Sequence, residues 1–551
     1  MSKTEAPVLV VGAGPSGLTI ANELVRHGVA VRIVDRAPAP ATTSRALVVQ
    51  PRCLEIFEDM GVIDDALALG NAVRSLNIMF AGGKGVRMQL HELLSDPANY
   101  TLYQTMYTLS QNETERILAE KLEKRGVHIE RGVAVTDLSA DEWGVTVSVR
   151  ARDGAMEPIR CRWLIGCDGA HSTVREAIGI PFEGATYADE FIMADAELDW
   201  GLPDGDIYAF PNRAGFVGVF AMPGTHRFRI FGNVAIGPGG HSAEYSEPTH
   251  EEFQAMLDER LPLPTKVVKE YWVSRYRLHR RTVPRYRDGR IFLVGDAAHV
   301  HSPAGAQGMN TGIQDAYNLA WKLALVVRGI AEEPMLDSYH AERHPIGVQL
   351  LKTTDRFFTA ISGQNAAARF LRTHLAPHIV SRVFTRRSFR AWFVGMLAQL
   401  RTAYPGSPLN REDGSGWRKD TPAPGDRARQ GDVIIDGKLG HLHDLFQGTR
   451  HTVLLFAGVE EQAQSTVELC RIADRIECAY PSLVRVGVVS TDRSASHSAV
   501  VSDLDRSAHG RYGVERAAAF VIRPDLHIAY RGTPIDVDSL LADLARRLPG
   551  A

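Results

Sequence analysis

Apolar and polar positions at the start of the chain alternate as in a strand, a glycine-rich turn, a helix and a second strand. Val8 to Val11 form an apolar, β-branched run, and Ser16 to His27 carry apolar residues at helical spacing. Gly28 can end that helix, and Val29 to Val34 form the second apolar run. This pattern predicts a β–α–β unit over residues 8–35.

The pattern then continues as mixed α/β structure up to about residue 184. It predicts a helix over Asn112 to Lys124, with Asn112 as N-cap and Glu115 three residues later. Strand-like runs follow at 127–130, 144–150 and 162–166.

From about 185 to 288 the pattern changes to short alternating runs separated by Pro and Gly. Such runs predict an antiparallel β-sheet inserted into the α/β framework. After residue 312 the spacing is helical up to about 402, and residues 403–425 are dense in Pro, Gly and charge, which predicts a linker. Residues 426–551 restart a mixed α/β pattern, with a clear strand at Val453 to Phe456.

Composition limits the classes of partner and compartment. The 551 residues allow three or four domains, and the net charge of -3 gives no reason to expect nucleic acid or an anionic membrane as a partner. No apolar run approaches the length of a membrane helix, which is about 20 residues. The five cysteines include no CxxC pair, so we expect reduced thiols in a cytoplasmic protein.

The first chemical motif is GAGPSG, in which Gly12, Gly14 and Gly17 form a G-x-G-x-x-G pattern. It follows a predicted strand and opens a predicted helix, and Asp35 closes the next strand. Glycines there allow a pyrophosphate to approach the helix N-terminus, and the acid can bind a ribose hydroxyl. A plain glycine turn is the alternative, but the context favours dinucleotide binding.

Two further motifs also place an acid and glycines directly after an apolar run. CDGAHSTVR contains Asp168 and Gly169, and taken alone it reads as a simple turn with an N-cap. GDAAHVHSPAGAQGMNTG contains Gly295 and Asp296 and leads into a helix. The carboxylate suits the hydroxyls of a sugar-like chain, and the partially positive helix N-terminus would stabilise a negative charge developing on a ring system.

Together the three motifs resemble the fingerprints of the class A flavoprotein monooxygenases, the single-component FAD-dependent aromatic hydroxylases. The resemblance covers about residues 1–400, with further matches at 44–61, 109–122 and 336–347. Residues 424–428 and 521–532 resemble the thioredoxin-like C-terminal domain of longer members, here without a CxxC pair. The branch that it resembles acts on polycyclic polyketides and phenols.

The resemblance implies a fold and a domain division. The fold is α/β, with a Rossmann-type FAD-binding domain, an inserted antiparallel substrate sheet, a helical segment and a thioredoxin-like α/β domain. The FAD-binding domain would comprise residues 1–184 and 289–402, the substrate domain 185–288, the linker 403–425 and the C-terminal domain 426–551. The C-terminal domain is interpreted as structural or dimer-related.

The resemblance also implies cofactor contacts. The FAD pyrophosphate would bind at Gly12, Gly14 and Gly17, and the adenosine ribose at Asp35, with Arg36 beside it. Asp35 stands where the family more often has glutamate. The other implied cofactor contacts are Arg45, Gln111, Asp168, Gly169, Gly295 and Asp296. Pro303 would lie by the isoalloxazine ring, and Gly308, Met309 and Asn310 would face its pyrimidine edge.

The implied reaction uses NADPH or NADH as a transient co-substrate to reduce FAD. O2 then forms a C4a-hydroperoxide, which transfers oxygen to an electron-rich ring. A Baeyer–Villiger-type insertion by the same flavin peroxide is an alternative, and so is a non-catalytic flavin-fold protein that only binds an aromatic compound. The basic run 277–290 could attract the NADPH phosphate, but a solvated charged face is the better interpretation.

The substrate side is less defined. Candidate substrate contacts in the strand-like runs are Tyr208, Phe210, Phe216, Phe220 and Arg229, although aromatic residues favour strands in any case. His299 and His301 are two apart with no third ligand in view, so we expect no metal site. We expect a small-molecule aromatic partner and a monomer or homodimer.

Overall fold

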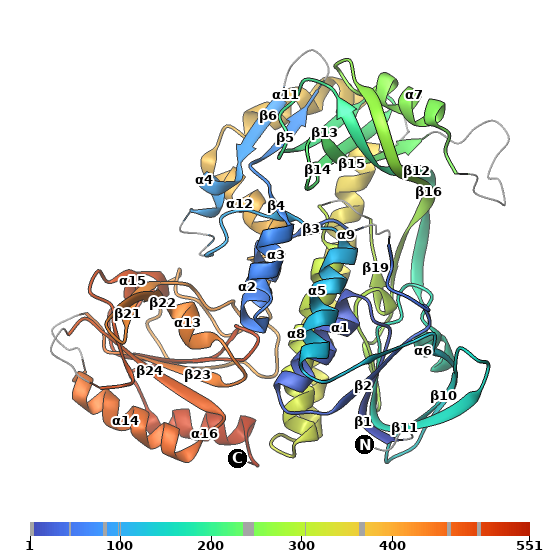
Figure 1. Cartoon of the computed structure of the whole chain (residues 1–551). Coiled ribbons are helices and arrows are strands. Elements are labelled where there is room, and N and C mark those ends of the chain that lie inside the picture. The colour runs from blue at the N-terminus through green and yellow to red at the C-terminus, as the bar shows by residue number, and fades with distance from the viewer. Residues whose placement is uncertain are drawn as a thin grey trace.

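The structure is a computed structural model that describes residues 5–42, 46–80, 85–96, 99, 101–234, 247–302, 305–362, 370–459, 464–492 and 497–550. These residues form three eight-stranded sheets and one three-stranded sheet. The first two sheets lie one above the other, and the third forms a separate lobe beside them (Figure 1).

The first sheet carries the cofactor motifs. Its main path runs β17-β18-β11-β1-β2-β8, and β10 and β9 extend it from β11. The bounds are β1 Glu5–Val11, β2 Val31–Asp35, β8 Ile129–Arg131, β9 Ala134–Ala140, β10 Val145–Arg150, β11 Met156–Gly166, β17 Arg287–Asp288 and β18 Ile291–Leu293. β18, β11, β1, β2 and β8 pair in parallel, with Val8 opposite both Val31 and Trp163. Both faces are covered, which explains the continuous apolar run at Val8–Val11.

Helices cover this sheet. α1 (Pro15–Arg26) packs against α5 (Gln111–Lys124) and α8 (Gly308–Val327). The predicted helix at 112–124 is confirmed, but its cap is different: Ser110 is the N-cap residue and makes no side-chain cap bond. Glu115 instead accepts a hydrogen bond from Gln111 one turn earlier.

The first 180 residues also contain several shorter elements. The helices are α2 Pro51–Met60, α3 Ile63–Leu69, α4 Leu90–Leu94 and α6 Thr173–Ala177. A small sheet, β3-β7-β4, comprises Val48–Val49, Tyr107–Thr108 and Asn71–Ala72.

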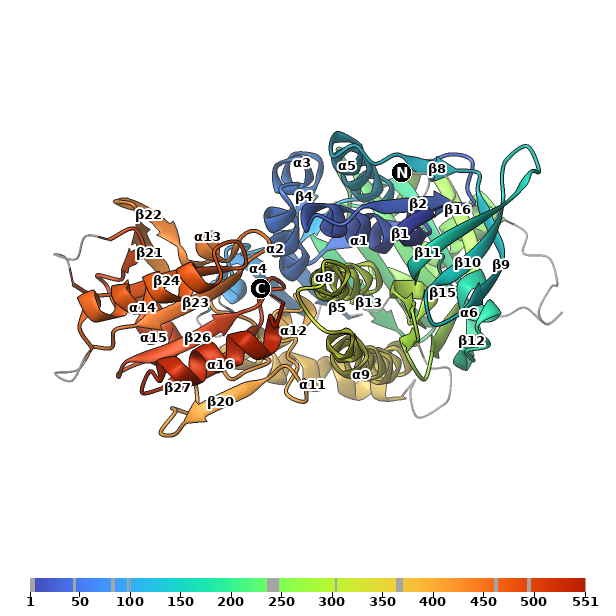
Figure 2. The same ribbon diagram turned by 90° about the horizontal axis from the view of Figure 1, so that it is seen from below.

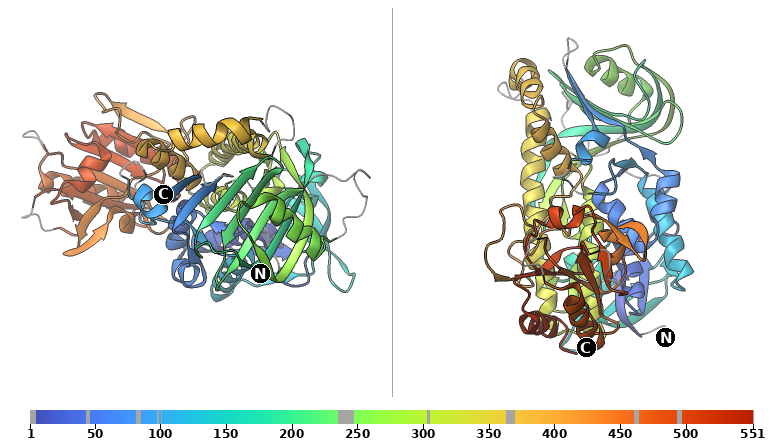
Figure 3. Two further views of the ribbon diagram at one scale, coloured as in Figure 1. Left: turned by 90° about the horizontal axis from the view of Figure 1, so that it is seen from above. Right: turned by 90° about the vertical axis from the view of Figure 1, so that its left-hand side faces the viewer.

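The second sheet corresponds to the predicted antiparallel one, in the order β19-β16-β12-β15-β14-β13-β5-β6, but its β13 and β5 pair in parallel. The bounds are β5 Ser75–Met79, β6 Gly85–Gln89, β12 Glu183–Asp199, β13 Ile207–Asn212, β14 Gly215–Ala221, β15 Arg227–Val234, β16 Lys266–Thr282 and β19 His299–Val300. β5 and β6 come from the amino-terminal part of the chain, so the sheet is not built from 185–288 alone. α7 (His250–Arg260) covers the outer face, away from the first sheet (Figure 3).

The helical region after residue 308 begins with α8, which lies in the middle of the molecule (Figure 2). It comprises α8, η2 (Glu333–Leu336), α9 (Asp337–Ser362), η3 (Leu371–Leu375), α11 (Ala376–Val383) and α12 (Arg387–Leu397). α8 is buried from Asn310 to Val326. It lies between the first sheet and the carboxyl-terminal lobe (Figures 1 and 2). No described helix is long and apolar enough to cross a membrane.

The third sheet forms the carboxyl-terminal lobe, in the order β20-β27-β26-β23-β24-β25-β21-β22. The strands are β20 Arg411–Gly414, β21 Asp432–Ile435, β22 Lys438–His441, β23 His451–Phe456, β24 Val484–Ser490, β25 Val500–Ser502, β26 Ala518–Ile522 and β27 Ile528–Thr533. The helices are α13 Leu442–Phe446, α14 Thr466–Ala479, α15 Ser507–Tyr512 and α16 Val537–Arg547. The thioredoxin-like assignment of this lobe stays a prediction.

The predicted linker at 403–425 is more ordered than its composition suggests. β20 lies within it and pairs in parallel with β27. The Tyr404 N–H donates to Gly425 O at 2.9 Å, and the Gly425 N–H donates to Ile528 O at 2.7 Å. Its backbone groups therefore bond to the third sheet, which a sequence rich in Pro and Gly does not reveal.

Candidate active site

The first two motifs meet at the carboxyl ends of the parallel strands β1 and β11. The Cys167 N–H donates to Val11 O at 2.7 Å. Gly12 has φ +102°, and a Cβ placed on it would lie 2.4 Å from Cys167 O. Only glycine allows this turn to pass so close to the second motif.

The third motif meets the first at Ser16, in the opening turn of α1. An added Cβ would lie 2.5 Å from Ser16 Oγ at Gly295 and 2.4 Å from it at Gly312. Gly295 opens the short helix η1 (Gly295–Ala297), and Gly312 is in the second turn of α8. The glycines therefore bring the start of α1, the β18 end and the start of α8 into contact.

Gly14 differs from the other two glycines of the first motif. Gly17 could not carry a Cβ, because it would lie 1.9 Å from Gly12 O. At Gly14 the nearest atom to an added Cβ is Glu115 Oε1 at 4.0 Å. The helix start is thus open at Gly14, which fits a pyrophosphate binding against its N–H groups.

Asp35, at the end of β2, is held in place by the glycine turn. Its Oδ2 accepts a hydrogen bond from the Ala13 N–H at 2.6 Å, and its Oδ1 accepts one from the Ala37 N–H at 2.7 Å. The carboxylate is half-buried, and each oxygen keeps a lone pair for a ribose hydroxyl. Arg36 is exposed beside it.

Asp168 fixes the turn of the second motif. Ser172 Oγ donates to Asp168 Oδ1 at 2.5 Å, and the Val174 N–H donates to Oδ2 at 3.2 Å. Burial raises the pKa of Asp168, although these hydrogen bonds oppose the shift. Gly169 follows with φ +82° and no atom within 4 Å of an added Cβ.

The start of α8 is tied to the small sheet by Asn310. Its Nδ2 donates to Val48 O at 2.8 Å, and its Oδ1 accepts from the Gln50 N–H at 2.8 Å. Gly308 begins the helix, and Met309 is partly buried. The geometry therefore fixes where the first N–H groups of α8 point.

The other predicted cofactor contacts are placed as follows. Asp296 is exposed in η1, directly after β18. Gln111 Nε2 donates to Glu115 Oε1 at 2.8 Å, on the side of Gly14. Arg45 and Pro303 lie outside the described residues. In the part of the chain that the structure describes, no group of three or more acidic, histidine or cysteine side chains could hold a metal ion.

Strand alternation divides the five substrate candidates between two faces of the second sheet. Tyr208 and Phe210 face α7 and pack with Trp200 in the core beneath that helix. The Tyr208 hydroxyl donates to Pro203 O at 3.0 Å. Their positions are those of core residues on the face away from the cofactor motifs.

Phe216, Phe220 and Arg229 lie on the opposite face. Phe216 belongs to a cluster that comprises Phe191, Met193, Phe231, Tyr276 and Leu278. Arg229 Nε and Nη2 donate to the two oxygens of Asp195 at 2.7 and 2.8 Å, and Trp272 Nε1 donates to Asp195 Oδ2 at 2.9 Å. Arg229 Nη1 also donates to Ala46 O at 3.1 Å, so this face is turned towards the segment that precedes β3.

A cavity of about 310 Å³ lies between this face and the N-terminus of α5. Its lining includes Asp195, Arg229, Trp272, Leu109 and Thr42. The sequence did not single out Asp195 or Trp272. Their contacts with each other and with Arg229 form across neighbouring strands, and no regular spacing along the sequence reveals such contacts. Ser16 was missed too, although its place inside GAGPSG was a usable signal.

Comparison with known proteins agrees with this geometry. Residues 5–354 match a protein family described as FAD binding domain. The chain is 35% identical to a 6-methylpretetramide 4-monooxygenase from Streptomyces rimosus, over 98% of this chain and 92% of that protein. It is 33% identical to a pentachlorophenol 4-monooxygenase from Sphingobium chlorophenolicum, over 96% of this chain and 94% of that protein.

A solved structure supports the same assignment along the whole chain. It is that of CabE, described as an aromatic hydroxylase from angucycline biosynthesis, with 28% identity, a TM-score of 0.76 and 99% of both chains covered. The chain belongs to the FAD binding domain family and is a FAD-dependent monooxygenase of its aromatic hydroxylase group.

Proposed function

We propose that this enzyme hydroxylates a phenolic or polycyclic aromatic compound, with NADPH or NADH as the reductant and O2 as the oxygen source. One observation carries the proposal: three motifs far apart in sequence converge at the start of α1, and Gly14 leaves that helix start open. The two relatives named above support the substrate class, since one is named for pentachlorophenol and the other for 6-methylpretetramide.

The chain's own residues would bind and orient the cofactor. The N–H groups around Gly14 would bind the pyrophosphate, Asp35 the adenosine ribose, and Asp296 the ribityl chain and diphosphate. FAD, when bound, supplies the transfer of an oxygen atom from O2 to the substrate. The N-terminus of α8 at Gly308, Met309 and Asn310 would favour negative charge at the pyrimidine edge of the ring system.

The remaining cofactor roles are part of the same proposal. They are assigned to Arg36, Arg45, Gln111, Asp168, Gly169, Gly295 and Pro303.

The FAD-binding domain would comprise 1–184 and 289–402, the substrate domain 185–288, and a thioredoxin-like domain 426–551. A cytoplasmic monomer or homodimer fits the net charge of -3 and the five free cysteines.

The inner face of the second sheet would receive the substrate. Phe216 and Phe220 offer aromatic surface for a planar ring, and Arg229 offers a fixed cationic group near a phenolic oxygen. Because Asp195 neutralises Arg229 through two hydrogen bonds, the pair suits a neutral aromatic better than an anionic one. Tyr208 and Phe210 would act only by supporting the sheet.

The test is NADPH oxidation by purified protein with and without a panel of phenols and polycyclic quinones, followed by mass analysis of the products. Ligand-stimulated oxidation with a gain of one oxygen atom on a ring carbon is the expected result. A protein that binds no FAD on reconstitution would overturn the proposal at its first step. Oxygen inserted beside a carbonyl would replace hydroxylation by Baeyer–Villiger chemistry.

A further inference from the structure

Arg343, on α9, is fully buried and donates to three acceptors, two on α8 and one on Tyr404. Its Nε donates to Asp315 Oδ1 on α8 at 2.6 Å. Its Nη2 donates to Thr311 O, in the opening turn of α8, at 3.3 Å, and its Nη1 donates to the Tyr404 hydroxyl at 3.0 Å. A planar guanidinium can hold three acceptors in fixed directions at once, which an ammonium group cannot.

Two of these contacts are made with α8, the helix whose start is proposed to face the flavin. Asp315 uses its second oxygen to accept a hydrogen bond from His299 Nε2 at 2.7 Å. Burial would raise the pKa of Asp315, but Arg343 and His299 outweigh it and lower that pKa. His299 lies on β19, between η1 and the start of α8, so Arg343 holds the first turn of α8 directly and β19 through Asp315.

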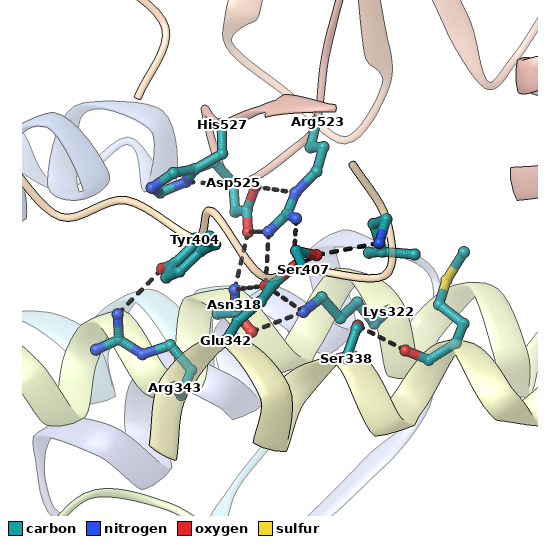
Figure 4. A network of polar contacts seen from close by, with 12 residues as sticks. Asn318, Lys322, Ser338, Glu342, Arg343, Tyr404, Ser407, Arg523, Asp525 and His527 are labelled. Carbon is teal, nitrogen blue, oxygen red and sulfur yellow. Dashed lines mark hydrogen bonds and ion pairs between the residues drawn. The ribbon is translucent and has the colours of Figure 1, made fainter. Parts of the chain in front are cut away.

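The third contact leads to the carboxyl-terminal lobe. The ring of Tyr404 packs on His527 with ring centroids 4.4 Å apart. Beside it, Glu342 accepts hydrogen bonds from Arg523 at 2.6 and 2.9 Å, from Lys322 at 2.7 Å and from Ser407 Oγ at 2.5 Å (Figure 4). Glu342 therefore binds both Arg523 of the lobe and Lys322 of α8, and the neighbouring Arg343 connects α8 to Tyr404.

We propose that Arg343 is a positioning residue of the flavin site, and that it sets the first turn of α8 only when the lobe is docked and presents the Tyr404 hydroxyl. The inference rests on the proposed function, because the start of α8 matters here as the place where the flavin ring binds. It gives the carboxyl-terminal lobe a role in holding the cofactor, although no residue of 426–551 belongs to the three cofactor motifs. Arg343 acts through Asp315 and Thr311 and touches no substrate in this scheme.

Tyr404→Phe tests the link, because it removes only the hydroxyl that accepts from Arg343 and keeps the ring on His527. Ser407→Ala is the matched control: it removes a hydroxyl from the same segment, but one bonded to Glu342. Both variants are prepared as full-length apoprotein and titrated with FAD, and the bound flavin is examined by visible circular dichroism and redox titration. Thermal unfolding of each variant confirms that it folds.

We expect Tyr404→Phe to weaken FAD binding three- to tenfold and to change the visible circular dichroism of the bound flavin. Ser407→Ala should bind FAD within twofold of the unchanged protein, with the same spectrum. Arg343→Lys should reproduce the Tyr404→Phe change or exceed it. Equal FAD affinity and spectra in Tyr404→Phe and Ser407→Ala would overturn the inference, whereas failure of the unchanged protein to bind FAD would overturn the proposed function instead.

Discussion

Gly12 and Cys167 are so close that a Cβ on Gly12 would lie 2.4 Å from the carbonyl oxygen of Cys167. This contact joins two motifs that are separated by 155 positions in sequence numbering (12 to 167), and it leaves no room for any other residue. Position 12 therefore requires glycine both for its positive φ and for this close approach.

Gly12→Ala should disrupt that contact and reduce FAD affinity at least tenfold, which is about 1.4 kcal/mol of binding free energy. FAD titration of the apoprotein measures the effect. Gly28→Ala is the control, since Gly28 has φ +80° but no atom within 4 Å of an added Cβ. Gly28→Ala should lower the free energy of unfolding by about 1–2 kcal/mol without changing FAD affinity, and equal FAD affinities in the two variants would contradict the prediction.

Asp296→Ala should remove the carboxylate proposed to bind the ribityl chain. Because Asp296 is exposed, the substitution should leave the unfolding midpoint nearly unchanged while the purified protein loses most of its flavin. The ratio of flavin absorbance to protein absorbance measures this loss, with Asp65→Ala on the exposed surface of α3 as the control. Full flavin content in Asp296→Ala would show that the third motif has another role.

The two faces of the second sheet should respond differently to the same substitution. Phe210→Leu, under α7, should lower the free energy of unfolding by about 1 kcal/mol and leave KM for the aromatic substrate unchanged. Phe216→Leu, on the inner face, should raise that KM several-fold at a similar cost in stability. Steady-state kinetics with a turned-over substrate and urea unfolding separate the two effects; a KM increase in Phe210→Leu alone would reverse the assignment of the faces.

Glu342→Gln should remove the buried carboxylate that Lys322 and Arg523 share, and leave Arg523 paired with Asp525 alone. Burial by itself would raise the pKa of Glu342, but the charges of Arg523 and Lys322 outweigh it and hold that pKa well below its usual range. We expect a loss of about 3–5 kcal/mol in the free energy of unfolding, measured by urea titration. Glu113→Gln breaks the exposed pair with Arg116 and should cost about 0.5 kcal/mol or less, so similar losses in both variants would refute the prediction.

Stability should fall in acid because of His451, which packs on Trp321 between the lobe and α8. Burial, with Arg547 and Arg523 nearby, lowers the pKa of His451 from its ordinary value of 6.5 to about 3. Between these values the unfolded chain binds the proton and the folded chain does not. The contribution is therefore complete above pH 6.5 and falls by about 1.4 kcal/mol per pH unit below it.

The measurement is the urea midpoint between pH 7 and 4 for the unchanged protein and for His451→Leu, with the exposed His128→Leu as the control. His451→Leu should show a weaker dependence on pH than the other two. Identical pH dependence in all three would mean that other groups cause the acid sensitivity.

Much of the framework was predictable, because it depends on local patterns. The β1–α1–β2 unit appears where apolar periodicity and Gly28 placed it, and helices follow residue 308. The inserted sheet also forms from the alternating runs after 185. Local composition predicted a linker before residue 425, but this Pro- and Gly-rich segment contains β20. The strand forms because it pairs with the distant β27 at the edge of the third sheet.

The sequence by itself indicated a dinucleotide, because GAGPSG stands between an apolar strand and a helix with Asp35 after the next strand, and the resemblance of the three motifs implied FAD. Tertiary structure alone decided that Phe216 lies on the inner face and Phe210 on the outer one, and that Arg229 pairs with Asp195. It alone decided that Arg343 connects the carboxyl-terminal lobe to α8. The physical reason is that a motif sets the backbone conformation of a few adjacent residues and can be seen in the sequence. Cross-strand pairs and buried ionic contacts depend instead on which distant segments the packed core brings together.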